Sequence, residues 1–573
     1  MSDDLLAKLR AKRREALARG VGEVGRALSV APAAAVSKAE ELWCRLAVER
    51  PGAKRSLRPV QVEMLVRAVR AQGLLAGVGV GHGKTLVTLT VSRLIDCARP
   101  LLLVPSARVR DKTLREALEY DDEFWLDERL QIMTYGELSS GRGEAKLAEL
   151  RPDLIIADEA HMLGRPGSSA RTGRMARYVK EHAPKFIALT GTLIKTSLRD
   201  YAHLAAWTLG EGSPLPRPCD HRALERWSLC IDTDQTDVWP TASDWSSMQA
   251  LVDRWGRAED LTGQRVRRKR ELVREAYQRR LRAAEGVVLT EDLSSDVELV
   301  LGRLSATRPD KVLDALDQLE AKWQRPDGEL LRTALEVGAV ARQLSLGFYY
   351  YWDWPDGVKD WAWLDARALW HAELRRVLKR PRPGRDTPAL VVKQIDEGGK
   401  LAEDEALVDA LKGWRRVADR PEPPTRVAWL SEAVIRDAVD FVRIWYPEAL
   451  IWYSDGAVAD LLERMGVTVV RGGESPPLEP DGLTALSVTA HGTGFNLQAW
   501  HVNLVLGAPA SATLNEQLLG RTHRAGQTER VQALYLVDKK GPLERALGKA
   551  LQRAERIEAA EGQRQRLLLG RWT

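Results

Sequence analysis

The chain of 573 residues has few cysteines and no long apolar segment. Its four cysteines are too few for a disulfide scaffold, and none forms a Cys-x-x-Cys pair. No stretch approaches the roughly 18 apolar residues of a membrane span, which argues against an integral membrane protein. The N-terminal segment is charged throughout and lacks the apolar core of a signal peptide, so export is not expected. These absences predict a cytoplasmic protein, or a nuclear one in a eukaryotic cell.

Phenylalanine is also scarce, with five residues, whereas tryptophan occurs 19 times. Hydrophobic residues make up 44% and charged residues 29%, which excludes a disordered chain. The net charge of +6 is unevenly placed, because 265–282 alone contains nine basic and two acidic residues. A local basic block indicates a polyanionic partner, and a solvated helix face is an equally good interpretation.

Short apolar runs alternate with helical patterns in two parts of the chain, which predicts an α/β fold with parallel sheets. In the first part, 51–213, the candidate strands lie within 73–80, 100–105, 153–160 and 186–192. In the second part, 425–540, they lie within 426–431, 450–454, 467–471, 485–490, 502–507 and 531–537. The intervening 214–424 is rich in tryptophan and charge, and we expect a helical insertion and linker there. Basic helices are expected at 1–50 and 541–573.

A glycine-rich turn, Gly81-His82-Gly83-Lys84-Thr85, follows the first apolar run and precedes a helical pattern. Such a turn presents backbone N–H groups to phosphates, while lysine supplies charge and the threonine hydroxyl can bind Mg²⁺. The longer GxxxxGK[ST] spacing is not met. The segment therefore predicts a phosphate loop of the shorter form.

Asp158-Glu159-Ala160-His161 follows another apolar run, so two carboxylates lie at the end of a predicted strand. Ligands bind at that end of open parallel sheets. One carboxylate can hold Mg²⁺ while its neighbour positions the attacking water. A lone acidic pair at a strand end is commonly just exposed, but this one lies 74 residues after a candidate phosphate loop, which favours the functional interpretation.

These segments resemble motifs I and II of the superfamily 2 helicases and translocases, a group that includes DEAH-box proteins and Swi/Snf-type ATPases. Four more segments match in family order: LRPVQ (57–61), LTGT (189–192), GTGFNL (492–497) and QLLGRTHRAGQ (517–527). Leu193 follows LTGT where the family usually has proline, and His82 stands where many relatives carry leucine. The matching blocks cover about half of the chain. Two short segments, 279–288 and 342–350, are similar to helicase-like proteins of phages and prophages.

The resemblance implies two RecA-like parallel-sheet domains separated by a large helical insertion. It implies an ATP hydrolase that uses Mg²⁺ and couples hydrolysis to translocation on nucleic acid, with duplex DNA favoured. Strand-separating DNA or RNA helicases, and a nucleotide-gated DNA clamp with little motor activity, are the alternatives. No membrane partner is implied.

The resemblance also implies residue roles. Adenine would meet Gln61, and the phosphates would meet Gly81, His82, Gly83 and Lys84. Mg²⁺ would be held by Thr85 and Asp158, and Glu159 would act as general base. Hydrolysis would be coupled to domain movement by His161, Thr190, Thr192 and Gly494. The γ-phosphate would meet Gln517, Arg521 and Arg524.

Two aromatic features leave alternatives open. Nine aromatic residues lie between Phe348 and Trp370, where they could pack in a core or stack on unpaired bases. Core packing is the more usual role of tryptophan. Tyr135 falls where relatives contact a nucleic-acid strand.

Overall fold

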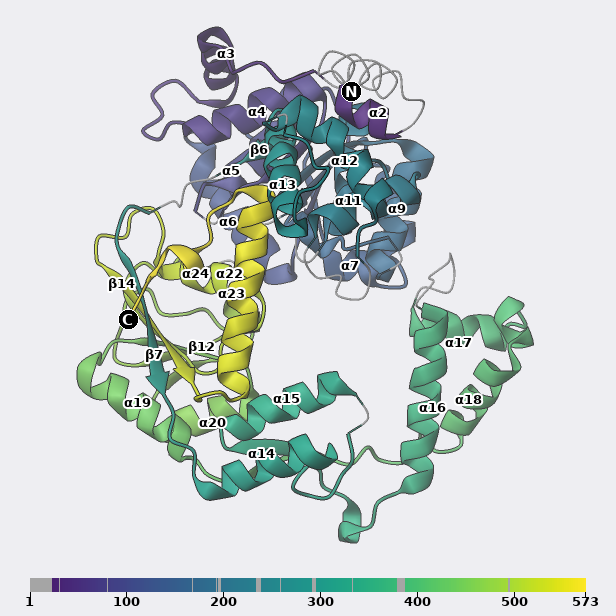
Figure 1. The fold of residues 1–573 in the computed structure, drawn as a ribbon, viewed down its shortest axis with the longest axis vertical. Coiled ribbons are helices and arrows are strands. Elements are labelled where there is room, and N and C mark those ends of the chain that lie inside the picture. The colour runs from purple at the N-terminus through teal and green to yellow at the C-terminus, as the bar shows by residue number, and fades with distance from the viewer. Residues whose placement is uncertain are drawn as a thin grey trace. The chain divides into compact units, whose positions relative to one another are not determined.

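The computed structural model describes residues 23–573 except 30, 80, 167, 192, 194–196, 233–238, 258, 291–294, 332, 379–386 and 493–494. The chain is an α/β protein that divides into two compact units (Figure 1). The first unit comprises Met1–Asp292, Leu374–Glu403 and Arg556–Gln563. The second comprises Leu293–Glu373, Asp404–Glu555 and Arg564–Thr573.

The first unit contains a six-stranded sheet in the order β3-β2-β4-β5-β1-β6, in which every neighbouring pair is parallel. Its strands are β1 (Leu74–Gly77), β2 (Pro100–Val104), β3 (Gln131–Thr134), β4 (Leu154–Asp158), β5 (Lys185–Thr190) and β6 (Val287–Leu289). Four of them lie in the predicted apolar runs, which confirms a parallel α/β sheet. The other two, β3 and β6, were not predicted, and β6 belongs to the segment expected to be helical.

Both faces of this sheet are buried, as near-continuous apolar strands require. Along β4, Leu154 and Ile156 belong to one core, while Ile155 and Ala157 belong to the other. The helices that supply the first core are α3, α4 and α5, and those that supply the second include α9 to α13. Their bounds, with the remaining helices of this unit, are α2 (Glu23–Ser29), α3 (Lys38–Val48), α4 (Pro59–Ala71), α5 (Lys84–Leu94), α6 (Ala107–Asp121), α7 (Tyr135–Ser139), α8 (Gly143–Leu150), α9 (Ala170–His182), α10 (Ala202–Leu209), α11 (His221–Ile231), α12 (Ala242–Trp255), α13 (Val266–Arg282) and α17 (Pro388–Asp396). Short 3-10 turns are η1 (Ala160–Met162), η2 (Leu198–Asp200), η3 (Gly210–Gly212) and η5 (Lys400–Glu403).

The second unit contains a seven-stranded sheet in the order β11-β12-β10-β13-β14-β7-β15, again with parallel pairs. Its strands are β7 (Leu299–Ser305), β10 (Leu450–Tyr453), β11 (Thr468–Val470), β12 (Thr484–Ser487), β13 (Val502–Val505), β14 (Val531–Val537) and β15 (Arg571–Trp572). The strand β7 lies within the expected insertion, and β15 lies within the expected C-terminal helix. Neither region is therefore wholly helical.

The run 426–431 does form a strand, but it does not join the large sheet. Instead β9 (Thr425–Trp429) pairs antiparallel with β8 (Phe348–Trp352) in a separate two-stranded sheet. The helices of this unit are α14 (Asp310–Lys322), α15 (Ala334–Ser345), α18 (Glu405–Arg415), α19 (Ala433–Trp445), α20 (Gly456–Arg464), α21 (Val488–His491), α22 (Ala512–Thr522) and α24 (Arg566–Leu569), with the turn η4 (Pro355–Gly357). Two helices contribute to both units: α16 (Trp361–Leu378) and α23 (Pro542–Glu561).

Most of the aromatic residues after Phe348 pack against one another. Trp363 is buried and makes edge contacts with Trp352, Trp354 and Trp414 at ring-centroid distances of 5.5–6.0 Å. The guanidinium of Arg367 lies over the rings of Trp352 and Trp363, 5.2 and 5.4 Å from their centroids. The core interpretation therefore holds for the buried Trp363, whereas Trp361 is 64% exposed.

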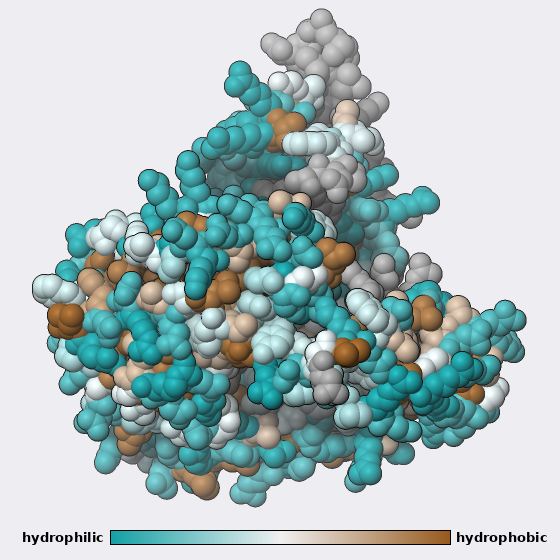
Figure 2. All heavy atoms as spheres, turned by 90° about the horizontal axis from the view of Figure 1, so that it is seen from below, coloured by the Kyte–Doolittle hydropathy of each residue, from teal (hydrophilic) through white to brown (hydrophobic). Residues whose placement is uncertain are grey.

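On the face seen in Figure 2, hydrophobic residues lie in small groups among hydrophilic ones. Isolated apolar side chains on a surface are normal and indicate no particular partner. Among the described residues, none of the helices is long and apolar enough to cross a membrane.

Candidate functional site

The glycine-rich turn joins the end of β1 to the start of α5, as the sequence predicts. Gly81 and Gly83 both have left-handed backbone angles, with φ of +96° and +76°. At Gly83 a Cβ atom would lie 2.4 Å from the amide nitrogen of Gln61, so glycine is required there for space as well as conformation. The amino group of Lys84 folds back over the turn and donates to the carbonyls of Val78 (2.7 Å) and Gly79 (3.2 Å).

The helix before the turn holds it in place. Gln61 is 4% exposed, and both ends of its amide bond to backbone. Its Oε1 accepts from the Arg58 N–H (2.8 Å), and its Nε2 donates to the Gly83 carbonyl (3.0 Å). Arg58 also donates to the Gly81 carbonyl (2.7 Å). Gln61, expected to read adenine, therefore acts in this structure as a brace of the turn.

Three neighbouring strands end beside one another in this sheet. Because β5 lies between β1 and β4, the strand leading to the glycine-rich turn, the strand ending at Thr190 and the strand ending at Asp158 are adjacent. All are parallel, so their carboxyl ends meet at one edge, where ligands bind in such sheets. The sheet thus brings together residues that lie up to 106 positions apart in the sequence.

The charge balance at this edge favours a bound cation or a proton. Burial, and then the neighbouring Glu159 charge, raise the pKa of Asp158 to about 7, while the Lys84 charge opposes this rise. The Lys84 charge therefore reaches Asp158, which relates the glycine-rich turn to the acidic strand end. One Asp158 oxygen accepts from the Glu159 N–H (3.0 Å).

Glu159 adopts a left-handed backbone conformation with φ +50°, which is uncommon for a residue other than glycine. Such conformations cost on the order of 1–3 kcal/mol and cluster at functional sites. Beneath it, the fully buried Tyr135 donates its hydroxyl to the Asp158 carbonyl (2.9 Å). Tyr135 is therefore a support for the acidic turn, and the expected contact with nucleic acid is wrong because its side chain has no exposed surface.

His161 connects two of the predicted segments. Its Nδ1 lies 2.9 Å from the Thr190 hydroxyl and 3.2 Å from a Glu159 carboxylate oxygen. Thr190 is fully buried at the end of β5. A contact chain therefore runs from Glu159 through His161 to the residue that begins the 190–193 loop.

The side chains at this edge offer the oxygen ligands that Mg²⁺ prefers. Asp158 and Thr85 offer hard oxygen donors, and the raised pKa of Asp158 marks a carboxylate that a cation would stabilise. Within the described ranges, no group of three or more His, Cys, Asp and Glu residues could hold a metal ion. Mg²⁺ characteristically binds through one or two carboxylates plus substrate phosphates, so this small donor set fits that ion.

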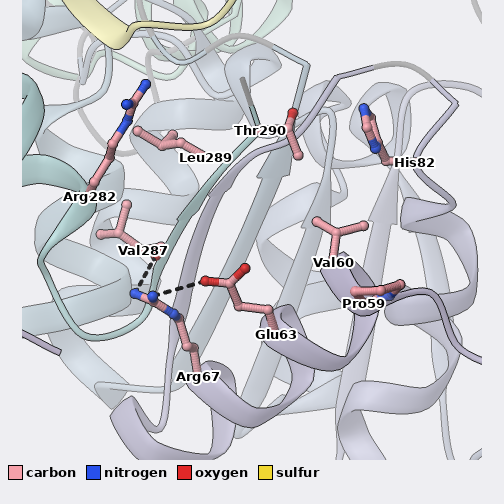
Figure 3. A pocket seen from close by; sticks show the side chains of 9 residues that line it. All are labelled: Pro59, Val60, Glu63, Arg67, His82, Arg282, Val287, Leu289 and Thr290. Carbon is pink, nitrogen blue, oxygen red and sulfur yellow. Dashed lines mark hydrogen bonds and ion pairs between the residues drawn. The ribbon is translucent and has the colours of Figure 1, made fainter. Parts of the chain in front are cut away.

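A pocket of about 490 Å³ lies next to the turn (Figure 3). It is lined by His82 from the turn, by residues of α4, by Leu289 at the end of β6 and by Thr290 after it. The Thr290 hydroxyl accepts from the Gly79 N–H (3.0 Å), which ties this wall to the turn. His82 therefore lines a pocket.

In the second unit, α22 carries two of the predicted residues, Gln517 and Arg521, and Arg524 follows its end. Arg521 is 6% exposed and donates to the carbonyls of Gly492 (2.9 Å) and Phe495 (3.1 Å), so the segments 492–497 and 517–527 meet. Gln517 is also buried, whereas Arg524 is partly exposed. Thr192 and Gly494 lie outside the described residues.

The C-terminal residues hold this helix from outside the motif. Arg566 is 1% exposed and forms an ion pair with Glu516. It also donates to the His523 carbonyl (2.9 Å). Arg566 thus fixes the residues on either side of Gln517 and Arg521, a role that the sequence did not reveal because the partners are more than 40 positions away.

The basic block forms α13, and its charges are divided between two roles. Arg280 is buried and donates to the Ala27 carbonyl (2.8 Å), and Arg274 donates to the Ile231 carbonyl (2.8 Å). In contrast, the Arg267 side chain is 93% exposed. Arg270 lies 5.6 Å from the ring centroid of Trp239, which is itself 63% exposed. One part of the helix is structural, and the other presents cations and an aromatic ring to solvent.

A scan against protein-family models and a search of curated proteins found no match to this chain.

Proposed function

We propose that this protein is an ATP hydrolase built on two RecA-like domains, and that it couples hydrolysis to translocation on duplex DNA. The proposal is carried by one observation: the glycine-rich turn after β1 and the acidic pair that ends β4 lie at the carboxyl ends of parallel strands separated only by β5. A phosphate-binding turn and an acidic pair in this order are what phosphoryl transfer from a nucleoside triphosphate requires.

The residues of the first unit divide the chemistry. The N–H groups at the start of α5 and the Lys84 charge bind the phosphates, once the lysine exchanges its carbonyl partners for them. Asp158 and Thr85 hold Mg²⁺, which supplies charge neutralisation on the phosphate oxygens when bound. Glu159 takes a proton from, or orients, the attacking water, and His161 sets the position of its carboxylate.

The resemblance assigns Gln517, Arg521 and Arg524 to the same reaction. Removal of an arginine that neutralises the transferring phosphoryl group costs on the order of 10³–10⁵ in rate. Arg521 has a second role in the proposal, because it joins motif VI to the carbonyls of motif V. Thr190, Thr192 and Gly494 belong to the proposed coupling of hydrolysis to movement.

The nucleic-acid partner is proposed from the family order of the motifs and from the exposed part of α13. Outward arginines beside an exposed tryptophan combine phosphate attraction with a stacking surface. A cation cluster of this kind suits DNA or RNA, and the resemblance to Swi/Snf-type ATPases favours duplex DNA.

The experiment is steady-state ATP turnover with single-stranded DNA, duplex DNA and RNA in parallel. We expect duplex DNA to stimulate most. Lys84→Ala and Glu159→Gln should each lower turnover by about 10²-fold or more, because each removes a group that acts on the transferring phosphoryl. The exposed Lys180→Ala and Glu181→Gln are matched controls for charge and should keep wild-type turnover. Turnover that survives Lys84→Ala would mean that the phosphate site lies elsewhere.

A further inference from the structure

The loop after β5 is held by a residue from the other end of the chain. The backbone N–H of Leu193 donates to a carboxylate oxygen of Glu561 at 3.2 Å. Both residues belong to the first unit, and both are buried. A proline at position 193, which is usual in the resembling family, has no N–H and could not make this bond. Because this chain has leucine at position 193, its backbone N–H can donate to Glu561.

The surrounding contacts fix the position of the Glu561 carboxylate. It is the last residue of α23, and Gly562, with φ +69°, ends the helix in the left-handed conformation that glycine permits. Around it, Gln278 donates to the Glu558 and Ala559 carbonyls and Arg282 donates to the Glu561 carbonyl. The end of α23 is thus fixed by α13, and Glu561 is fully buried. A buried carboxylate is costly unless it accepts hydrogen bonds, so its bonds specify the geometry around it.

The loop that Glu561 holds begins at the proposed active site. Three residues before Leu193, Thr190 contacts His161, which in turn contacts Glu159. Each contact in this series is 3.2 Å or shorter. A shift of the loop at Leu193 would therefore reach the proposed general base through the Thr190 hydroxyl.

We propose that Glu561 is a positioning residue for ATP hydrolysis, which acts by holding the 190–193 loop through the Leu193 N–H. This inference rests on the proposed function. Five residues after Glu561, the segment reaches Arg566, which bonds to Glu516 and His523 in the second unit. One short segment therefore anchors motif III through Glu561 and motif VI through Arg566, each within its own unit.

The test is ATP turnover, with and without duplex DNA, for Glu561→Ala and Glu561→Gln. Alanine removes the acceptor, whereas glutamine keeps a carbonyl oxygen at the same place. We expect Glu561→Ala to lower kcat on the order of 10- to 100-fold, because a displacement of about 1 Å has that effect on catalysis. The KM for ATP should change little, since the phosphate-binding turn is not contacted, and Glu561→Gln should recover most of kcat. Glu555→Ala removes a charge from an exposed position of the same helix and is the control.

Leu193→Pro supplies the second arm, because it deletes the donor and leaves Glu561 in place. In the double variant Leu193→Pro/Glu561→Ala, the loss of kcat should be no greater than in the more affected single variant. Thermal unfolding of every variant separates a folding defect from a catalytic one. Unchanged kcat in Glu561→Ala, an equal loss in Glu561→Gln, additive losses or a matching rise in KM would each overturn the inference. Absence of turnover in the wild-type protein would instead refute the proposed function itself.

Discussion

At the residue scale, the charged form of Asp158 is disfavoured by its surroundings, and a bound cation or a proton would offset this cost. Its side chain is held in a setting that disfavours charge, chiefly through burial and then through Glu159. Structural carboxylates normally have partners that lower their pKa, as Glu137 does beside Lys146. A carboxyl group with the opposite shift at a strand end is a candidate for binding or catalysis.

This cost predicts a specific dependence of stability on pH. The carboxyl ionises near 3.8 in the unfolded chain and near 7 in the folded one, so folding weakens as pH rises between these values and stays weakened above. Asp158→Asn removes the cost. We expect its free energy of unfolding to exceed that of the wild type by about 1–3 kcal/mol at pH 8 without nucleotide, and by much less at pH 4.5, while turnover is lost. Part of the side chain meets water, which keeps the gain below the full shift.

Denaturant unfolding at both pH values, in metal-free buffer, measures the difference. Asp111→Asn, at an exposed position of α6, is the control for a simple loss of charge. Equal stability of wild type and Asp158→Asn at pH 8 would show that Asp158 is not destabilised by its surroundings.

Sequence reasoning reached the residues that lie in short motifs and missed those that act from a distance. Lys84, Asp158, Glu159, His161 and Thr190 were found because each stands at a fixed offset from a strand end. The supporting residues were found only in the structure. Tyr135, Glu561 and Arg566 act through partners 23, 368 and 43–50 positions away, and single side chains leave no pattern over such separations.

At the scale of elements, the clearest of the predicted strands are continuous apolar runs, such as LLLV in β2 and LIIA in β4. The missed strands have less signal: β6 and β15 have three and two residues. The core of β7, LVLG, was overlooked because charged helical patterns surround it. The strand β9 was predicted correctly, but its place in the large sheet was not, because it pairs with the distant strand β8.

The exposure of each arginine on α13 predicts which of these charges would bind DNA. We expect Arg265, Arg267 and Arg270 to meet phosphates, whereas Arg274 and Arg280 donate to backbone carbonyls within the fold. Replacing these three by glutamine should flatten the dependence of log Kd on log salt by up to about 3, because each phosphate contact contributes about 0.9. Fluorescence anisotropy with a labelled duplex between 50 and 200 mM salt, as an experimental range, measures the slope.

The matched control replaces Arg436, Arg443 and Arg464, three exposed arginines of α19 and α20. Their loss changes net charge equally and should leave the slope nearer to that of the wild type. If both triple variants have the same slope, α13 contributes only general charge, and the solvated-face interpretation of the block is correct.

At the scale of the whole molecule, the two units are not continuous in sequence. The first receives 374–403 and 556–563 in addition to its N-terminal part, and the second is completed by 564–573. A division at 213, 424 and 540, drawn from patterns along the chain, cannot capture this, because a compact unit is defined by contacts in space.

This arrangement bears on whether the protein translocates, separates strands or only clamps DNA. A translocase hydrolyses ATP at each step, so the ATPase rate should rise with duplex length and reach a plateau, whereas a nucleotide-gated clamp turns over slowly at every length. We expect length-dependent turnover, and displacement of a third strand from a triplex without separation of the duplex strands. Glu159→Gln should abolish displacement while DNA binding persists. A rate independent of length would support the clamp, and strand separation in a parallel unwinding assay would identify a helicase, so the two measurements together decide among the three mechanisms.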